Sequence, residues 1–231
     1  CLGEACEGPE DCMSELCVDH MGGRVCSRTC DSECPQGWSC REVTMGGSDV
    51  AFICLSDHAN LCRPCATSSD CVSAQGTEDA CVVYGTWSGG AGIDAGLEGR
   101  FCASSCGADA DCPEDFSCRE VTTAEDVTLV RCVRSEGDCP CSETAVDLGL
   151  HTPCERSGEH GICEGARQCT NTGLTACDAP EPSPEECNGI DDNCDGVVDE
   201  ETCPNDNPCA VATCAGADGC VVELLDGVPC Q

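Results

Sequence analysis

Basic residues are scarce in this chain of 231 residues, and lysine is absent. Ten arginines stand against 44 aspartates and glutamates, so the formal net charge is −34 at pH 7. Proteins that bind nucleic acid use clustered lysine and arginine to neutralise phosphates. The composition therefore excludes a nucleic-acid-binding protein and disfavours contact with anionic surfaces.

Large apolar side chains are scarce as well. The chain has two tryptophans, one tyrosine and three phenylalanines, and its longest apolar stretches, such as residues 221–225, fall far short of the roughly 18 residues of a membrane span. Thirty-one cysteines stand in place of the large core that a domain of this length normally buries. This composition is typical of an oxidised disulfide scaffold. We therefore expect an extracellular or outer-cell-surface protein of small disulfide-rich modules in tandem, with short β-hairpins and irregular loops, little helix and an elongated form.

The first 133 residues contain a tandem repeat. Residues 34–44 read CPQGWSCREVT, and residues 112–122 read CPEDFSCREVT. Several cysteine spacings are identical in the two copies. We expect both copies to share one disulfide connectivity, although eight cysteines alone allow 105 pairings. The matched cysteines are Cys1, Cys6, Cys12, Cys17, Cys26, Cys30, Cys34, Cys40 and Cys54 in the first copy and Cys62, Cys65, Cys71, Cys81, Cys102, Cys106, Cys112, Cys118 and Cys132 in the second.

Short hairpins pinned by cystines are expected within each copy. Asp11, Asp70 and Asp111 each precede a cysteine, where Asx-type hydrogen bonds to the following backbone favour turns. The apolar runs Val50–Cys54 and Val127–Cys132 are typical of closing strands.

Trp38 and Phe116 occupy equivalent positions in the two copies. We expect each to be the small apolar plug of its copy, with stacking against a ligand as the alternative. Residues 87–92 are rich in glycine and indicate a mobile surface loop. Cys62 and Cys65 have the spacing of a redox motif, but no βαβ pattern surrounds them, which favours structural half-cystines.

These copies resemble the cysteine-rich repeats of secreted proteins and lipoproteins of myxobacteria and related bacteria. They resemble dickkopf-type and EGF-sized disulfide modules more loosely. The resemblance covers the first 133 residues.

An odd number of cysteines leaves one without a partner in the chain. The sequence begins at Cys1, with neither methionine nor a signal sequence before it. A bacterial lipoprotein begins at a cysteine whose thiol carries a diacylglycerol anchor, so Cys1 is a candidate lipidation site. Such an anchor is the only membrane contact that we expect. The alternative is that Cys1 is a half-cystine or a free thiol in a longer protein.

Residues 186–200 have the donor pattern of a calcium loop. Asp191, Asn193 and Asp195 alternate, so a curved loop can direct three oxygens inward, as positions 1, 3 and 5 of an EF-hand loop do. Gly196 falls at position 6, where the backbone turns sharply.

The rest of the expected shell comes from the Val197 carbonyl at position 7 and from Asp199 or Glu200. Thiols and imidazoles are absent from these donor positions, which disfavours zinc and copper. Position 12 is Thr202 rather than glutamate and no amphipathic helices flank the loop, so the segment departs from a full EF-hand. With the acidic residue Glu200 at position 10, it instead resembles shorter extracellular loops of the excalibur and thrombospondin type 3 kinds. We predict a calcium site here. The alternative is a solvated acidic turn that holds no ion.

Residues 161–200 resemble the MopE-like metal-binding motif of a methanotroph copper-binding surface protein and of many secreted myxobacterial proteins. Copper does not follow from this resemblance, because the matching residues are oxygen donors and cysteines. Residues 207–230 resemble another short repeat of the same secreted proteins. The residues that match the motif are Cys163, Gly165, Arg167, Cys169, Gly173, Cys177, Pro184, Glu186, Cys187, Gly189, Asp191, Asn193, Cys194, Asp195, Gly196, Asp199 and Glu200.

Five segments are expected along the chain. Residues 1–57 and 58–136 are the two copies, and residues 137–186 form a cysteine-rich linker module. Residues 187–203 are the acidic calcium-type loop, in which cystines preform the curvature. Residues 204–231 are a short C-terminal repeat.

No catalytic motif is recognisable. Four histidines, His20, His58, His151 and His160, are the only ordinary bases near neutral pH, and we expect all of them at the surface. Ser88 lacks the spacing of a nucleophile elbow.

We therefore expect a noncatalytic structural or binding subunit of a cell-surface assembly, such as an adhesin or filament, with calcium as its cofactor. Its partners would be other surface proteins or copies of itself. The alternative is an accessory, noncatalytic region of a larger secreted hydrolase.

Overall fold

A computed structural model describes residues 2–44, 50–73, 79–84, 99–137, 139–200, 203–205, 207 and 209–225. The chain divides into two compact units. The first comprises Cys1–Cys154 and Ala166–Ala176, and the second comprises Glu155–Gly165 and Cys177–Gln231.

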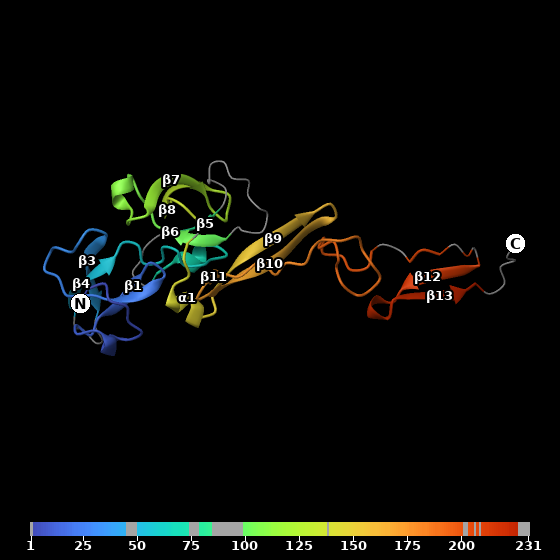
Figure 1. Ribbon diagram of the computed structural model, residues 1–231, viewed down its shortest axis with the longest axis horizontal. Coiled ribbons are helices and arrows are strands. Elements are labelled where there is room, and N and C mark those ends of the chain that lie inside the picture. Colours follow the sequence, from blue (N-terminus) through green and yellow to red (C-terminus); the bar gives the residue numbers. More distant parts are fainter. Residues whose placement is uncertain are drawn as a thin grey trace. The chain divides into compact units, whose positions relative to one another are not determined.

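Short antiparallel strand pairs make up most of the secondary structure (Figure 1), which confirms the predicted class of small disulfide-rich modules. The four hairpins of the first unit are β1–β2, β3–β4, β5–β6 and β7–β8. A three-stranded sheet has the order β11-β10-β9, and β12 pairs with β13. The strands are β1 Cys17–His20, β2 Gly23–Cys26, β3 Trp38–Thr44, β4 Val50–Ser56, β5 Ala80–Val83, β6 Arg100–Ala103, β7 Phe116–Thr122, β8 Thr128–Arg134, β9 His151–Gly158, β10 Gly161–Thr170, β11 Gly173–Leu174, β12 Ala210–Cys214 and β13 Cys220–Leu224.

Helical structure is confined to short turns in the described part of the chain. The α-helix α1 spans Glu143–Asp147 and begins at Ser142, whose side chain accepts a hydrogen bond from the Ala145 backbone amide. The 3₁₀ turns are η1 Pro9–Asp11, η2 Ser68–Cys71, η3 Asp109–Asp111 and η4 Gly216–Asp218. None of the described helices has the length and hydrophobicity to cross a membrane.

Disulfide pairing shows that each predicted copy consists of two smaller modules. In each module, which we call a cystine module, four cysteines a, b, c and d follow in chain order, and the bonds join a to c and b to d. Both copies use the same pairing, as predicted. The bonds of the first four cystine modules are Cys6–Cys17 with Cys12–Cys26, Cys30–Cys40 with Cys34–Cys54, Cys65–Cys81 with Cys71–Cys102, and Cys106–Cys118 with Cys112–Cys132.

Cysteines c and d face each other across the hairpin of each module. In the first module, Cys17 lies opposite Cys26 in the register of β1 and β2. Each of them is bonded to a cysteine of the preceding loop, so the two disulfides fasten that loop to the hairpin. The equivalent facing pairs are Cys40 with Cys54, Cys81 with Cys102, and Cys118 with Cys132.

A fifth cystine module lies in the second unit. Cys187 is bonded to Cys214 and Cys203 to Cys220, which repeats the pairing of a to c and b to d. Cys214 and Cys220 face each other in the register of β12 and β13. The acidic segment 188–202 therefore lies between cysteines a and b of a module.

The three aspartates predicted at turns each hold the loop between cysteines a and b. Oδ2 of Asp11 accepts hydrogen bonds from the backbone amides of Glu7 and Gly8, at 2.9 and 3.0 Å. Asp70 and Asp111 accept from the two equivalent amides of their own modules. The turns are confirmed, but the predicted direction was wrong. These carboxylates bind preceding amides, because the 3₁₀ turn brings the aspartate back to the start of the loop.

Backbone amides lower the pKa of two of these aspartates. Hydrogen bonds from Gly8 and Glu7 hold the pKa of Asp11 below its ordinary value, and hydrogen bonds from Thr67 and Ala66 do the same for the pKa of Asp70. An ionised carboxylate accepts amide hydrogen bonds more strongly than a neutral carboxyl does, so these contacts favour the charged form.

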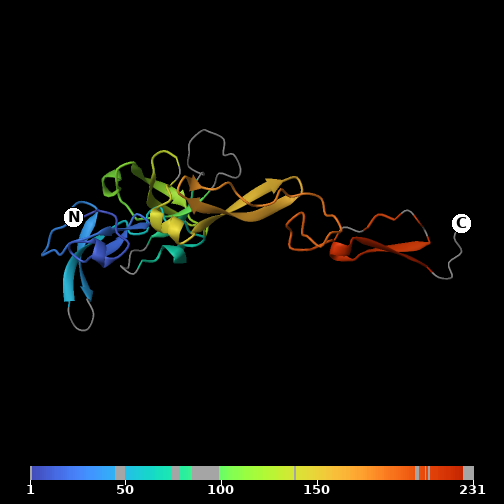
Figure 2. The same ribbon diagram turned by 60° about the horizontal axis from the view of Figure 1, so that its bottom comes forward.

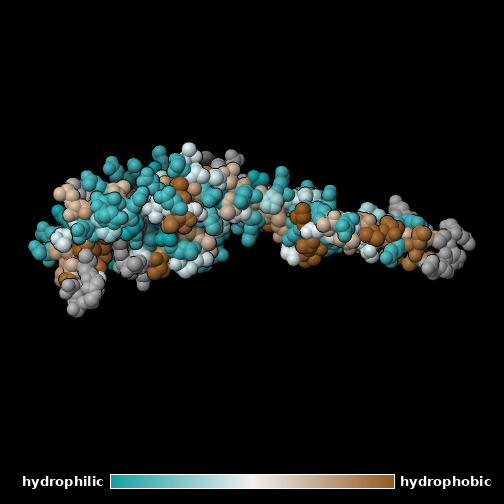
Figure 3. Space-filling model, turned by 90° about the horizontal axis from the view of Figure 1, so that it is seen from below, coloured by the Kyte–Doolittle hydropathy of each residue, from teal (hydrophilic) through white to brown (hydrophobic). Residues whose placement is uncertain are grey.

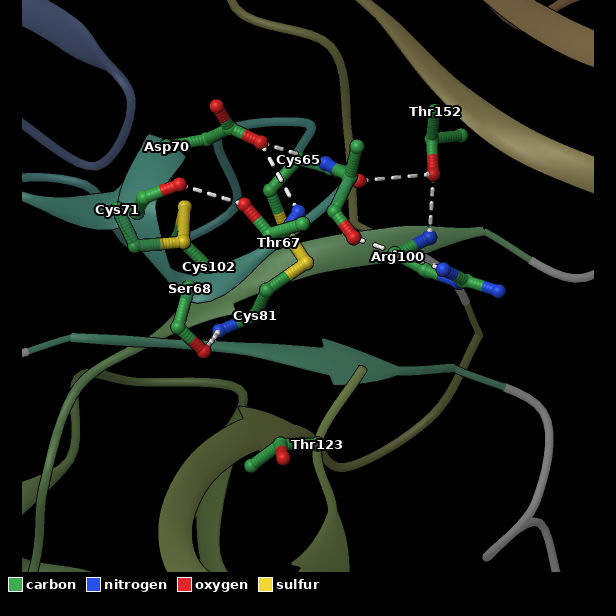
Figure 4. Close-up of a disulfide and its surroundings, with 12 residues drawn as sticks. Cys65, Thr67, Ser68, Asp70, Cys71, Cys81, Arg100, Cys102, Thr123 and Thr152 are labelled. Atoms are coloured by element: carbon green, nitrogen blue, oxygen red, sulfur yellow. Dashed lines mark hydrogen bonds between the residues drawn. A yellow bond between two sulfur atoms is a disulfide. The ribbon is translucent and has the colours of Figure 1, made fainter. Parts of the chain in front are cut away.

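The third module illustrates how one loop is bound on several sides (Figure 4). Ser68 Oγ accepts the amide of Cys81 at 3.1 Å. Thr152 Oγ1, which is fully buried, accepts the Arg100 amide at 2.6 Å and lies 3.5 Å from the Cys65 carbonyl, to which it donates. These bonds connect the hairpin β5–β6 to the first strand of the three-stranded sheet.

Two small apolar clusters replace a single large core in the first unit. Phe116 belongs to one of them, and Trp38 packs against the other. Both aromatic residues are therefore apolar plugs, as predicted. The first cluster contains Leu61, Val82, Tyr84, Phe101, Phe116, Val121 and Val133, and the second contains Leu16, Val18, Ile53 and Leu55.

Every cysteine in the described ranges is disulfide-bonded. Cys62 pairs with Cys139 and Cys65 with Cys81, which confirms that the redox-like spacing belongs to structural cystines. The predicted closing strands are also confirmed, as β4 and β8. The candidate lipidation site Cys1, the glycine-rich segment 87–92 and Thr202 lie outside the described residues.

Candidate cation-binding loop

The acidic loop is attached to the rest of the second unit by three cystines. Cys187 and Cys203 bracket it through the fifth cystine module. Cys194, in the middle of the loop, is bonded to Cys163 on β10. The sequence prediction that cystines shape this loop is thereby confirmed.

Glycines of β10 allow the acidic loop and the segment before it to lie directly against this strand. A Cβ atom added at Gly161 would overlap the backbone carbonyl of Asn193, and one added at Gly165 would overlap the backbone of Ala179. Figure 2 shows the loop, in orange, beside the tip of the β9–β10 hairpin. The close approach therefore requires glycine at both positions.

Asp191 forms the centre of the hydrogen-bonded turn. Its Oδ1 accepts the Asp195 amide at 3.2 Å, and its Oδ2 accepts the Gly196 amide at 2.9 Å. The chain can curve back in this way because Gly196 has φ = +91°, in the left-handed region that favours glycine. This arrangement brings positions 1, 5 and 6 of the predicted calcium loop together.

Asn193 and Asp195 also accept amides that follow them in the chain, in each case two residues ahead. Asn193 Oδ1 accepts the amide of Asp195 at 2.8 Å, and Asp195 Oδ1 accepts the amide of Val197 at 2.8 Å. Asn193 Nδ2 also donates to Glu200 Oε1 at 2.7 Å. The predicted donors are thus neighbours within one turn of the chain.

Asp199 has a structural role that the sequence pattern did not reveal. Its Oδ1 accepts the amides of Asn188 and Gly189, at 2.8 and 2.9 Å. These are the first and second residues after cysteine a of the fifth module, the same positions that Asp11 binds in the first module. Asp199 is therefore the counterpart of the aspartates that fasten the shorter loops.

Two further acidic residues organise the loop and were missed by the sequence prediction. Glu185 accepts the Asn193 amide with Oε1 at 2.8 Å and the Asp199 amide with Oε2 at 3.1 Å. Asp192 Oδ2 accepts the Asn188 side-chain amide at 2.9 Å. No spacing rule pointed to these two residues. The only signal was their membership in the same acidic run.

The charge of this segment is uncompensated within the segment itself. Residues 185–200 contain seven carboxylates and neither arginine nor histidine. Each carboxylate oxygen has two acceptor sites, so an oxygen that accepts an amide retains a second site for a cation. The donor set consists of hard oxygens, which suit calcium or magnesium better than zinc or copper.

Cysteine clusters elsewhere do not offer a competing metal site. Sulfurs of Cys30, Cys34 and Cys40 lie close together, and similar groups occur in the other cystine modules. All of these sulfurs are disulfide-bonded, so they are not the thiolates that bind metals.

Two of the four histidines depart from the predicted surface location. His58 is 5% exposed, and His20 is half-buried. His151 and His160 are exposed, as predicted. The two buried rings lie where the two sequence copies meet, and only the tertiary structure brings them together.

The chain matches no family model, no curated protein and no solved structure. Functional interpretation therefore depends on the chemistry of the residues described above. The coarse class is defined by the cystines: the chain is built from small disulfide-rich modules, which are typical of extracellular structural or binding proteins.

Proposed function

We propose that this protein is a noncatalytic structural or binding subunit of an extracellular, cell-surface assembly and that its loop at residues 187–203 binds calcium. The cystine modules provide a scaffold that is stable outside the cell. The calcium ion stiffens the one long loop of the fifth module. Supporting observations come from the cystine pattern, the acidic turn and the exposed apolar surface of the C-terminal hairpin.

The position of Asp191 is the single observation that carries the calcium proposal. Its two oxygens already bind the amides of Asp195 and Gly196, so the chain is curved before any ion binds. A cation at this turn would meet Asp191, Asn193, Asp195, the Val197 carbonyl, Asp199 and Glu200. Of these, Asp199 contributes Oδ2, since Oδ1 already accepts two amides.

Repulsion among the carboxylates supplies the driving force for cation binding. Seven negative charges in sixteen residues repel one another, and a divalent ion relieves that repulsion. Calcium sites of extracellular modules have Kd values of roughly 10⁻⁴ to 10⁻³ M. We place this loop in that class because it is exposed to solvent and lacks the bidentate glutamate of an EF-hand.

Exposed apolar side chains on the C-terminal hairpin support a role in binding other proteins. Val222 and Leu224 on β13 are 57% and 75% exposed. Figure 3 shows apolar residues gathered on this hairpin. Contiguous apolar surface of this kind is typical of protein–protein contacts. Its partners would be other surface proteins or further copies of this chain.

An NMR titration of the isotopically labelled protein with calcium chloride tests the calcium proposal. We expect saturable shifts of the Asp195, Gly196 and Val197 amides at submillimolar to millimolar calcium. Asp191→Ala and Asp195→Ala should each weaken binding at least about tenfold.

Glu223→Gln is the matched control, because Glu223 is exposed on β13 in the same unit and lies outside the loop. It should bind calcium like the wild-type protein. Unchanged binding in Asp195→Ala, or shifts spread evenly over exposed carboxylates, would show that the loop is a solvated acidic turn.

A further inference from the structure

Among the described cysteines, no disulfide joins the two sequence copies at their junction. Each described cysteine of residues 1–57 pairs with another cysteine of the same copy. Each described cysteine of residues 58–136 pairs within the second copy or with Cys139. Both copies belong to the first compact unit, so noncovalent contacts hold the junction together.

His58 is at the centre of these contacts. Its backbone carbonyl accepts the amide of Met21 from the first copy at 2.8 Å. Its amide donates to Ser56 Oγ of the first copy at 3.1 Å, and its ring Nδ1 lies 2.7 Å from the hydroxyl of Ser104, which like His58 belongs to the second copy. Next to it, the carbonyl of Ala59 accepts the Gly22 amide at 3.0 Å.

His20 completes the cluster from the side of the first copy. Its Nδ1 lies 2.7 Å from the same hydroxyl of Ser56 that accepts the His58 amide. Its ring stacks on Trp38, with centroids 5.1 Å apart and planes inclined by 21°. Both histidines and Trp38 line a cavity of about 280 Å³ together with the loop 110–114 of the second copy.

The surroundings of both rings favour the neutral form. Burial lowers the pKa of His58, although the carboxylate of Asp57, a hydrogen bond with the Asp111 backbone and the carboxylate of Asp111 oppose the change. Burial also lowers the pKa of His20, and the charge of a protonated His58 adds to that effect. Besides Asp111, the charged residue that lines the cavity shared by both histidines is Glu114. A second cavity, which His20 lines without His58, has the charged residues Glu7, Asp11, Arg24, Glu143 and Asp147 in its lining.

We propose that His20, Ser56, His58 and Ser104 form an acid-sensitive latch between the two copies. In mild acid the rings of His20 and His58 become charged, and the resulting repulsion and hydration separate the copies. The disulfides within each copy keep its own modules folded. The junction is therefore the place where a fall in pH can change the geometry of this cystine-braced chain.

The direction of the effect follows from proton linkage. A histidine with a depressed pKa in the closed junction binds its proton more readily when the junction is open. Closure of the junction is therefore fully favoured above about pH 6.5, the ordinary pKa of histidine. It weakens as the pH falls towards the lowered pKa that the histidine has in the closed junction. Each histidine reduces the closure constant about tenfold per unit of pKa depression.

Hydrogen exchange of single amides can detect this opening. The Met21 and Gly22 amides donate across the junction, whereas the Cys54 and Cys132 amides donate within one copy, to the carbonyls of Arg28 and Ser104. After correction for the intrinsic exchange rate, protection of the first two should fall at least about tenfold between about pH 7.5 and about pH 5. Protection of Cys54 and Cys132 should stay constant.

Variants separate this mechanism from general acid destabilisation. The double variant His20→Gln with His58→Gln keeps polar side chains of similar size that cannot be protonated, so its exchange should not depend on pH beyond the intrinsic rate. His151→Gln, which replaces an exposed histidine in the same unit, should behave like the wild-type protein.

Three results would overturn the latch. The first is unchanged protection of Met21 and Gly22 in the wild-type protein, which decides the question even where the double variant fails to fold. The second is a parallel loss of protection at Cys54 and Cys132. The third is full pH dependence in the folded double variant.

Discussion

Cys17 and Cys26 face each other across the hairpin β1–β2 but are not bonded to each other. Cys17 is bonded to Cys6 and Cys26 to Cys12, so two parallel cross-links attach the preceding loop to one end of the hairpin. A two-stranded hairpin is at best marginally stable in water by itself. The cystine pair therefore supplies the restraint that a third strand or an apolar core would otherwise provide.

Loss of a disulfide should cost more stability where it closes a longer loop. Cys62–Cys139 spans 77 residues and Cys30–Cys40 spans 10. The loop-entropy relation gives about 4.5 kcal/mol for the first and about 2.8 kcal/mol for the second. Unfolding by guanidinium chloride measures the free energy of unfolding of two double variants, Cys62→Ser with Cys139→Ser and Cys30→Ser with Cys40→Ser. The first variant should lose more of this free energy than the second. The reverse order would mean that native packing, rather than restriction of the unfolded chain, sets the contribution of these bonds.

Replacing Asp70 by asparagine should reduce stability near neutral pH and leave it unchanged in strong acid. Backbone amides lower the pKa of Asp70 in the folded protein, so its charged form contributes stability above the ordinary value of 3.8, and this contribution is lost as the pH falls through the lowered value. The carboxylate is mostly exposed, so the loss at pH 7 should stay below about 1 kcal/mol.

Thermal melts of Asp70→Asn at about pH 7 and about pH 2.5 provide the measurement for that comparison. Glu120→Gln, on the exposed face of β7, is the control and should match the wild-type protein at both pH values. If Asp70→Asn is less stable than the wild-type protein by the same amount at both pH values, the stabilisation does not come from the charge of Asp70.

Glu185→Ala should loosen the acidic loop without unfolding the module. The variant loses the carboxylate that accepts both the Asn193 and the Asp199 amides. We expect these two amides to lose about tenfold or more in exchange protection, and calcium affinity to fall as well. The Leu225 amide, which donates to the Cys209 carbonyl beyond the loop, should keep its protection. Equal protection of Asn193 and Asp199 in variant and wild type would contradict this role of Glu185.

Phe116→Ala should be strongly destabilising, whereas Phe52→Ala should not. Phe116 is 7% exposed within the larger apolar cluster, and Phe52 is 50% exposed on β4. Removal of a buried phenylalanine costs about 3 to 5 kcal/mol, and removal of an exposed side chain costs about 0.5 kcal/mol or less. Chemical denaturation of both variants measures the difference. Equal effects would show that the cystines alone determine stability.

Much of the fold could be predicted from the sequence because cysteine spacing and turn residues act locally. The closing strands at Val50 and Val127, the plugs Trp38 and Phe116 and the common connectivity of the two copies are all present in the structure. The division into cystine modules could not be predicted. The distance from cysteine c to d varies from 6 to 21 residues, so only the bonds reveal the recurring pattern.

The candidate site was predicted less completely than the fold. The alternation of Asp191, Asn193 and Asp195 correctly indicated a curved loop, because each side chain binds an amide only a few residues ahead. The contribution of Glu185 depends on how the chain before the loop folds back onto it. The burial of His20 and His58 depends in the same way on contacts between copies that are distant in the sequence.

Reduction under otherwise native conditions tests the central claim most directly. The claim is that disulfides, rather than an apolar interior, hold the modules in shape. Two-dimensional NMR spectra before and after treatment with an excess of a phosphine reductant, with the free thiols counted, provide the measurement. The account predicts that dispersed amide signals collapse into the narrow range of an unfolded chain as the thiols appear. A fully reduced protein that keeps its dispersed spectrum would contradict it.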